Sequence, residues 1–325
     1  MSDLLAPGYR VRHPESADLD AVHALIVASE IEDFGESQGY GIDDLEREWK
    51  QLDLGQDAWV VTTPDGAFAG YGYVQDRRHV RMDAEVYVRP AHFSRGVGTT
   101  LVRLTEARAR EHVALAPPGT RVVVNNWINA LNADARSLLE REGYTPVRYF
   151  FRMEKDLNEA PQVVSWPEGI VVRNGHAGDD LRPFYETIEE AMAGQWGHVE
   201  VSFEEWLERR QRTNIDPGLW SLALENGEPA AAVLCSIFAG IGWIDTLGVR
   251  EPWRRRGFGL ALLRHAFHEL YGRGLRRVAL GVDAENPTGA TRLYERAGMH
   301  ISQQYATYGK ELRAGIEPAA VDDHG

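Results

Sequence analysis

The chain has 325 residues, more than the roughly 250–300 at which a single hydrophobic core stops growing, so we expect two domains. Its net charge of -14 argues against a general nucleic-acid binder, which needs a basic surface. No apolar run approaches the about 20 residues of a membrane span, and the first residues lack the apolar core of a signal peptide, so we expect a cytoplasmic protein without membrane contact.

The first half contains three runs with the composition of strands, at 58–63, 68–74 and 84–88. A turn with Gly96 and Gly98 follows the third run and precedes a helical pattern. Together these runs predict a unit in which strands lead through a glycine turn into a helix.

The second half repeats this order. Strands are expected at 219–224, 230–238 and 243–249, and the second of these holds the single cysteine, Cys235, which we expect to be buried and free of disulfides. After a second glycine turn, one apolar helix face is predicted, and Gly272 and Gly274 end it; the face consists of Leu260, Leu263, Phe267 and Leu270. A buried strand at 276–282 and a helix at 290–297 complete the α/β pattern.

These landmarks recur at a fixed distance. Val249, Gly257 and Gly259 each follow their counterparts in the first half by 161 residues. Two tandem domains of one kind are therefore expected, at 1–155 and 169–325, with a proline-containing acidic linker at 156–168.

The second glycine turn, "RRRGFG", follows a strand and opens a helix, where free N–H groups and the helix dipole favour an anion. It lacks the Gly-Lys-Ser/Thr of a Walker loop, and Leu262 stands where a dinucleotide fingerprint has its third glycine. The glycines let the backbone approach a bound group closely, which suits a pyrophosphate. A solvated surface turn is the alternative.

With these motifs in place, both halves resemble the GNAT superfamily of acyl-CoA-dependent N-acyltransferases, most closely from Trp243 to Met299. The resemblance implies a mixed α/β sheet flanked by helices in each of two tandem domains, and acetyl-CoA as co-substrate. No metal is expected, because the 11 histidines are scattered along the chain. Asn286 would contact the cofactor, and Tyr294 would protonate the departing thiolate. The cofactor would also bind at the strand positions Leu247, Gly248 and Val249 and at the turn residues Arg254, Arg255, Arg256, Gly257, Phe258 and Gly259.

The chemistry of acyl transfer suits these residue types. An amine that attacks a thioester directly needs a base and a proton for the thiolate, and a phenol with a pKa near about 10 is a reasonable donor. Alternation along the strand places Asp245 on the same face as Leu247 and Val249, which makes it the candidate base. A structural carboxylate is an equally weighted alternative for Asp245, and a packed core aromatic is the alternative for Tyr294.

The first copy departs from the pattern at its reactive positions. Phe93, Ala84 and Leu139 stand where the second copy has Arg254, Asp245 and Tyr294. We therefore expect catalysis in the C-terminal domain, while the N-terminal domain supports it, binds coenzyme A without turnover, or shapes the substrate cleft. A loop with Trp196 and His198 and the acidic residues Glu200, Glu204 and Glu205 are candidates for a cationic substrate's pocket; a packed loop and a solvated helix face are the alternatives.

We expect an N-acetyltransferase for a small-molecule primary amine, either a monomer or a homodimer. The tandem layout is similar to that of mycothiol synthases, which acetylate the cysteinyl amine of a thiol–sugar conjugate, and this is the second interpretation. A protein acetyltransferase is the third, and a non-catalytic acyl-CoA sensor is the alternative from another class.

Overall fold

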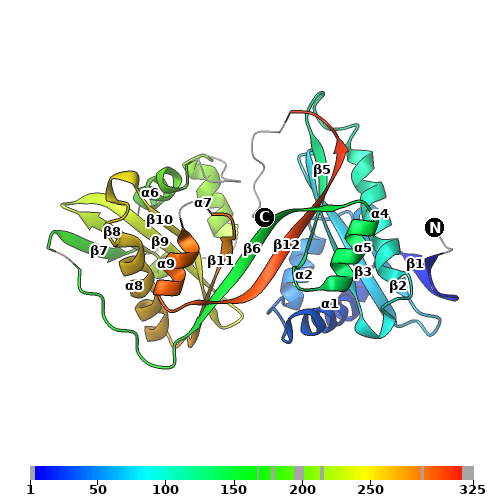
Figure 1. Ribbon diagram of the computed structural model, residues 1–325, viewed down its shortest axis with the longest axis horizontal. Helices are drawn as coiled ribbons and strands as arrows, with labels where there is room; N and C mark the ends of the chain where they lie inside the picture. Colours follow the sequence, from blue (N-terminus) through cyan, green and yellow to red (C-terminus); the bar gives the residue numbers. More distant parts are fainter. Residues whose placement is uncertain are drawn as a thin grey trace. The chain divides into compact units, whose positions relative to one another are not determined.

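The computed structural model describes residues 4–166, 168–176, 180–193, 201–212, 216–286 and 289–316 (Figure 1). The chain divides into two compact units. Unit 1 comprises residues 1–149 and 304–321, and unit 2 comprises residues 150–303 and 322–325. Each unit is a mixed sheet with helices, which confirms the predicted α/β class. Among the described residues, no helix is long and apolar enough to cross a bilayer.

The sheet of unit 1 has the strand order β1-β2-β3-β4-β5-β12. Neighbouring strands are antiparallel except β4 and β5, which are parallel and are connected through helix α4. The strands are β1 (Arg10–Arg12), β2 (Ala58–Thr62), β3 (Phe68–Arg77), β4 (Arg81–Val88), β5 (Val122–Asn129) and β12 (His300–Arg313). The helices are α1 (Leu19–Phe34), α2 (Ile42–Trp49), α3 (Leu54–Asp57), α4 (Val97–His112) and α5 (Ala133–Arg141).

Unit 2 has the same plan, with the strand order β7-β8-β9-β10-β11-β6. The parallel pair here is β10 and β11, connected through helix α8. The strands are β6 (Thr145–Asp156), β7 (Ile170–Asn174), β8 (Ser221–Glu225), β9 (Glu228–Phe238), β10 (Ile241–Val249) and β11 (Arg277–Asp283). The helices are α6 (Arg182–Met192), α7 (Phe203–Arg212), α8 (Phe258–Gly272) and α9 (Ala290–Arg296).

Helix α8 forms where its apolar spacing predicted it. Leu263, Phe267 and Leu270 are buried in the unit 2 core, and the helix ends at Gly272. Gly274, two residues later, has a φ of 88°, a left-handed value that suits glycine. The predicted strands are likewise present, and Cys235 in β9 is fully buried.

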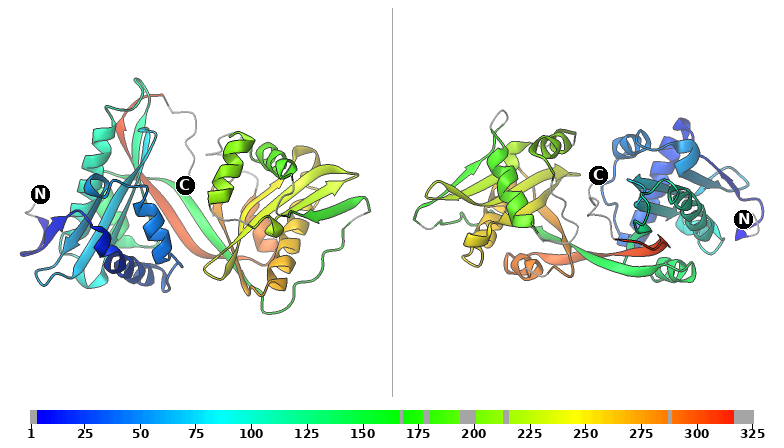
Figure 2. Two further views of the ribbon diagram at one scale, coloured as in Figure 1. Left: turned by 180° about the vertical axis from the view of Figure 1, so that it is seen from behind. Right: turned by 90° about the horizontal axis from the view of Figure 1, so that it is seen from above.

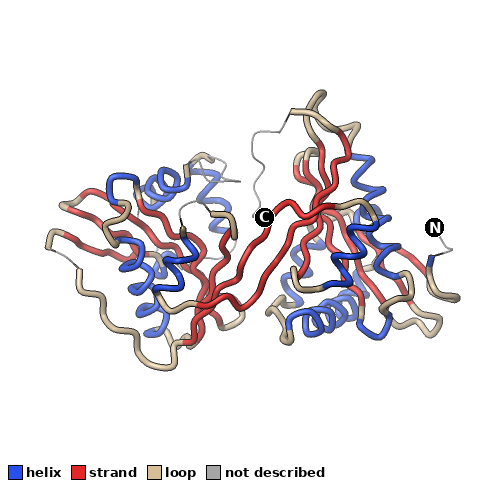
Figure 3. The backbone as a smooth tube through the Cα atoms, in the orientation of Figure 1, coloured by secondary structure: helices blue, strands red, loops and turns tan. Residues whose placement is uncertain are grey.

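The two units differ from the predicted division at 155 and 169, because each unit takes its last strand from the other repeat. Strand β6 begins after α5, and its residues 150–156 pair with β11 in unit 2. Strand β12 follows α9, and its residues 305–313 pair with β5 in unit 1 (Figure 3). Hydrophobic burial drives this exchange, since Met153 of β6 and Tyr308 of β12 lie in the cores they enter.

We predict that Tyr308→Ala destabilises unit 1, although this residue belongs to the second repeat. Tyr308 is 2% exposed, and truncation of a buried aromatic leaves a cavity that costs about 3–5 kcal/mol. Hydrogen exchange of α4 and β5 should accelerate, while α8 keeps its protection. Ile301→Ala on the same strand is the control, because Ile301 is 38% exposed. Faster exchange in α8 rather than in α4 would contradict the assignment of β12 to the core of unit 1.

Candidate active site

Strand β10 lies between β9 and β11, but only its pairing with β9 continues to the end of the strand. It is paired with antiparallel β9 along its length. With parallel β11, the part of the chain that the structure describes has two pairs, Gly242 with Val278 and Trp243 with Ala279. Beyond Trp243 the two strands part, so backbone groups on that edge of residues 244–249 have no strand partner among the described residues. An extended ligand can bind such an edge with the bonds that a strand would make.

The turn after β10 ends at Gly257, the N-cap of α8, whose φ of 91° is left-handed. Apart from this glycine and its two chain neighbours, no atom of the described residues lies within 4 Å of the place that a Cβ would take here. Gly257 has no side chain to cap the helix, so N–H groups of the first turn, from Phe258 to Leu260, are left for solvent or a ligand. With the dipole of a 15-residue helix behind them, these groups suit an anion.

The three predicted arginines of the turn have different environments. Arg254 donates to two backbone carbonyl oxygens, one at the end of β10 and one near the end of α6, both at 3.1 Å. Arg256 makes two hydrogen bonds to the carboxylate of Glu225, at 3.0 and 2.6 Å. Arg255 is exposed, and within the described residues it has no hydrogen-bond or ion-pair partner. Arg254 and Arg256 therefore hold the turn in shape, and Arg255 is the arginine left for an anion.

Two other predicted glycines allow helices to approach closely. A Cβ on Gly259 would lie 3.2 Å from the Leu293 side chain of α9. A Cβ on Gly248 would lie 2.8 Å from the Ala191 side chain of α6. These contacts explain both glycines by packing, and they bring α9 to the start of α8.

A β-bulge at Asp245 changes which way the residues of β10 point. The pairing with β9 shifts register between Ile244 and Thr246, which leaves Asp245 as the extra residue. On either side of the bulge the faces reverse: a Cβ on Gly242 would meet Leu270 of α8, whereas one on Gly248 would meet α6. These two helices lie on opposite faces of the unit 2 sheet (Figure 2).

The prediction that Asp245 shares a face with Leu247 and Val249 is therefore wrong. It assumed unbroken alternation, and the inserted residue breaks it. Val249 lies on the α8 face, where its side chain is 3.6 Å from the place of a Cβ on Gly259. Asp245 bonds instead to Ser236, which is paired with Trp243.

Asp245 is chemically suited to exchange protons near neutral pH. It is exposed, and one of its oxygens accepts a hydrogen bond of 2.8 Å from the Ser236 hydroxyl. Although solvent reaches this side chain, the protein around it weakens the hydration of the carboxylate. This desolvation raises the pKa of Asp245 to about 6, against the opposing effects of the hydrogen bond and of the positive charge on Arg210. An exposed carboxyl with this pKa is a base at pH 7 that a substrate can reach.

Arg210 itself was missed by the sequence reasoning. It lies one turn after the buried Trp206 on α7, and its guanidinium lies 5.3 Å from that ring and 6.0 Å from the ring of Trp220. Burial lowers the pKa of Arg210, and the negative charge of Asp245 opposes this effect. The available signal was its spacing of four residues from an apolar tryptophan, which places a charge on the buried face of a helix.

Tyr294 lies in α9, half-buried against the unit 2 core. Burial raises the pKa of Tyr294 to about 12. Its hydroxyl makes no hydrogen bond to another described residue, so its proton is available for a ligand. The neighbouring Leu293 packs on Gly259, which fixes the helix that carries the phenol against the start of α8.

The predicted Asn286 and Asn132 of unit 1 are in different settings. Asn132 in unit 1 caps α5, since its side chain accepts from the Ala135 N–H at 2.9 Å, and its amide donates to Asp33 at 2.6 Å. Asn286 lies in the turn after β11, where its N–H donates to the Asp283 carbonyl at 3.1 Å. It does not cap α9, whose N-cap is Gly289.

In unit 1 the corresponding glycine turn is covered by the start of the chain. Gly96 has a φ of 79°, but a Cβ there would lie 1.9 Å from the Leu4 carbonyl oxygen. The Ala6 N–H donates to the Arg95 carbonyl at 3.0 Å, which fixes this segment on the turn. A carbonyl oxygen beside the turn repels an anion. Leu139, at the place of the phenol, is 2% exposed and belongs to the core.

Unit 1 instead contains a cluster of carboxyls and tyrosines that the sequence reasoning missed. Tyr73 donates to Glu48 at 2.8 Å, and Tyr87 donates to Glu85. Burial raises the pKa of each of these two carboxyls to about 7. The ring of Tyr71 lies 5.7 Å from that of Tyr73 and 6.4 Å from that of Tyr87. The alternate tyrosines of "YGYV" were the signal in the sequence.

The acidic residues predicted for a cationic substrate have ordinary surroundings where they are described. Glu204 is exposed and lies 3.8 Å from Arg182, and the N–H of Glu205 donates to the Ser202 hydroxyl at 3.1 Å in the first turn of α7. Trp196, His198 and Glu200 lie outside the described residues.

Comparison with known proteins agrees with these features. The family model described as "Acetyltransferase (GNAT) family" matches residues 24–144 and 181–299. A mycothiol acetyltransferase of Beutenbergia cavernae is 32% identical over 266 residues, 77% of this chain and 82% of its own. One of Cellulomonas flavigena is 28% identical over 284 residues, 82% of this chain and 77% of its own.

Solved structures repeat the whole two-unit plan. The crystal structure of a GCN5-related N-acetyltransferase from Sphaerobacter thermophilus has a TM-score of 0.86 and 41% identity, and it covers 98% of this chain and 100% of its own. A tandem GNAT protein from the clavulanic acid biosynthesis pathway has a TM-score of 0.69 at 15% identity, over 94% and 99% of the two chains. The second likeness concerns the fold alone.

We predict that Glu85→Gln makes the free energy of unfolding less dependent on pH. In the folded protein the pKa of Glu85 is about 7, above its ordinary value of 4.5. The folded protein therefore favours the protonated form of Glu85. The stabilisation from this form is fully present below pH 4.5 and is lost as the pH rises through about 7. Between these limits the wild type should lose about 2–3 kcal/mol more free energy of unfolding than the variant.

Urea denaturation at pH 4.5 and pH 8 measures this difference. The control is Glu46→Gln, an exposed carboxylate on α2, the helix that carries Glu48. It should keep the wild-type pH dependence. Parallel curves for the wild type and Glu85→Gln would mean that Glu85 is ordinary in the folded state.

Proposed function

The chain belongs to the acetyltransferase (GNAT) family, and on that premise we propose that unit 2 transfers the acetyl group of acetyl-CoA to the primary amine of a small molecule. The observation that carries the proposal is the difference between the two glycine turns. At Gly257 the space above the turn is open, whereas at Gly96 the backbone of Leu4 fills it. A diphosphate therefore fits the turn of unit 2 and not that of unit 1.

The open turn and the parted strands supply a complete site for an elongated cofactor. The N–H groups of Gly257, Phe258 and Gly259, with Arg255, would hold the pyrophosphate, while Arg254 and Arg256 keep the turn in shape. The unpaired backbone edge from Leu247 through Gly248 to Val249 would hold the pantetheine chain, and Asn286 would contact the cofactor from the turn after β11.

The reaction needs two proton transfers, and unit 2 has a group for each. Asp245, directly or through a water molecule, takes a proton from the ammonium acceptor, and the neutral amine then attacks the thioester carbonyl. As the carbon–sulfur bond breaks, Tyr294 donates its proton to the thiolate. A phenol whose pKa is raised to about 12 by burial stays protonated at neutral pH, which this role requires. Acetyl-CoA supplies the acyl group, so no covalent enzyme intermediate is needed.

The relatives favour one acceptor. The two curated proteins compared above, at 28 and 32% identity, are both named mycothiol acetyltransferases. The cysteinyl amine of a thiol–sugar conjugate is therefore the second candidate, within the same class of small primary amines. The intact turn would also suit an acyl-CoA sensor without turnover. That hypothesis does not explain why a candidate proton donor and a candidate base occur in the same unit.

An acceptor screen tests the function directly. Purified protein is incubated with acetyl-CoA and a panel of amines that includes a cysteinyl pseudodisaccharide, and free coenzyme A thiol is measured. We expect thiol release that depends on one class of amine. Slow release that no amine stimulates would favour the sensor and overturn the proposal.

We predict that Gly257→Ala weakens coenzyme A binding by at least about tenfold. The left-handed φ of 91° costs alanine about 1–2 kcal/mol, and relief of this strain distorts the N–H groups at the turn. Gly274→Ala is the matched control: its φ is 88°, it also has open space around it, and it lies just past the other end of α8. Calorimetry with coenzyme A should separate the variants. Equal affinities would mean that the turn does not bind the cofactor.

We predict that Tyr294→Phe lowers kcat about 100-fold or more and leaves KM for acetyl-CoA nearly unchanged. The hydroxyl makes no hydrogen bond to a described residue, so its removal leaves the packing intact. Tyr271→Phe on α8 is the control and should retain wild-type kcat. Full activity of Tyr294→Phe would remove this residue from the mechanism.

A further inference from the structure

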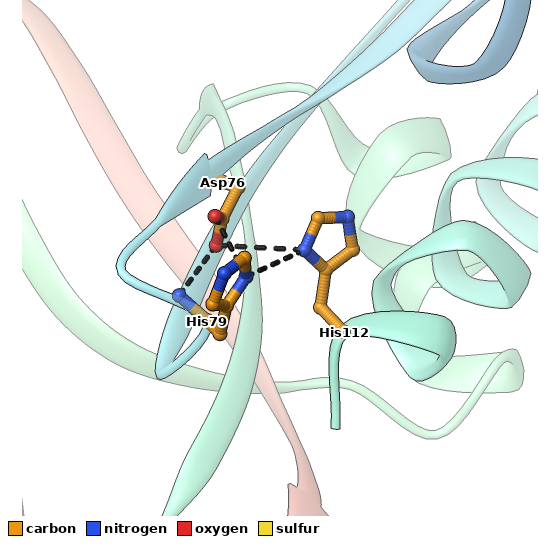
Figure 4. A group of neighbouring side chains, drawn as sticks. All are labelled: Asp76, His79 and His112. Atoms are coloured by element: carbon orange, nitrogen blue, oxygen red, sulfur yellow. Dashed lines mark hydrogen bonds and ion pairs between the residues drawn. The ribbon is translucent and has the colours of Figure 1, made fainter. Parts of the chain in front are cut away.

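Three side chains that could bind a metal converge at one end of unit 1 (Figure 4). Asp76 lies near the end of β3, His79 lies in the turn between β3 and β4, and His112 is the last residue of α4. Their ligand atoms all lie within 4.8 Å of one another. Residue 112 is far from the other two in sequence, which is why no metal-ligand spacing appears in the chain.

The distances fit one ion. The two Nδ1 atoms of His79 and His112 are 2.9 Å apart, the His79 Nδ1 is 2.8 Å from a carboxylate oxygen of Asp76, and the His112 Nδ1 is 3.7 Å from the other oxygen. In a tetrahedral zinc site with bonds of about 2.0–2.1 Å, neighbouring ligand atoms are about 3.3 Å apart. The observed separations lie on both sides of that value, so small side-chain rotations would place all three around one ion.

The backbone holds two of the ligands in place. His79 has a φ of 60°, a left-handed value, and its N–H donates to Asp76 at 2.6 Å. The turn is therefore closed by the same carboxylate that faces both imidazoles. Without an ion, the two Nδ1 atoms can form a hydrogen bond only if one of them carries a proton. The other Nδ1 must then be unprotonated, so that its lone pair accepts that proton.

The cluster lies where an ion can reach it, and Arg108 beside it is already paired. The side chain of His112 is 11% exposed, and those of Asp76 and His79 are 28% and 38% exposed. Arg108, one turn before His112, is bonded to Asp57 at 2.8 Å. Its charge is therefore largely offset and does not exclude a cation.

We propose that Asp76, His79 and His112 bind a divalent transition-metal ion, zinc by preference, through both Nδ1 atoms and one carboxylate oxygen. Two imidazoles and a carboxylate are a common protein ligand set for zinc, and water would complete the tetrahedron. The ion would join the turn between β3 and β4 to the end of α4 and so stabilise unit 1. This site is separate from the proposed acetyl-transfer site, since its ligands all belong to unit 1.

The test is calorimetric titration of the full chain with Zn²⁺ alone, after treatment with a chelator and dialysis. We expect binding of one equivalent in the wild type. His112→Ala should weaken it by more than the about 10–100-fold typical for loss of an outer-shell partner. His79→Asn should do the same, and asparagine tolerates the left-handed backbone at that position, so this variant keeps the turn. Circular dichroism without metal verifies that both variants are folded.

His300→Ala is the matched control, because His300 is exposed and lies outside the cluster. It should bind Zn²⁺ like the wild type. Titration with Co²⁺ gives an independent readout, since a tetrahedral site with nitrogen ligands produces visible absorption bands that both cluster variants should lose. No heat of binding in the wild type, or equal affinity in the wild type and both cluster variants, would overturn the proposal and leave a hydrogen-bonded cluster only.

Discussion

The cofactor site proposed for unit 2 depends on the parting of β10 from β11 after Trp243. A sheet satisfies its backbone groups by pairing, and at this point one edge of β10 loses its partner. The chain then enters α8 through Gly257, whose left-handed backbone leaves the N–H groups of the helix start uncapped. A line of unpaired backbone groups that ends in a positive helix terminus matches a molecule with an extended amide arm and a diphosphate.

The bulge at Asp245 adds the second feature, because it places the proposed base on the opposite face of β10 from Val249. Before the bulge, the even-numbered residues of β10 point toward α8, and after it they point toward α6. Asp245 can therefore leave the face on which Val249 packs and approach Ser236 and Arg210. Tyr294 is carried by α9, which the contact of Leu293 with Gly259 holds against the start of α8.

Much of this could be predicted from local sequence. Apolar spacing at Leu263, Phe267 and Leu270 located α8, and the repeat of the glycine turn indicated two related units. The features that could not be predicted depend on pairing between distant segments. Alternation gives no sign of a bulge, and a strand pattern such as that of β12 does not specify which sheet the strand joins. The segment at Leu4 that covers Gly96, and the meeting of His112 with Asp76, are likewise tertiary contacts.

Of the two related glycine turns, only the one in unit 2 is proposed to bind the cofactor. Amide hydrogen exchange with and without coenzyme A tests this proposal directly. The two turns begin different helices, α4 and α8, so the exchange of each turn is measured separately. We expect slower exchange at residues 254–262 and along 244–249, with no change at 93–101. Protection at 93–101, or no protection at 254–262 at saturating coenzyme A, would contradict it.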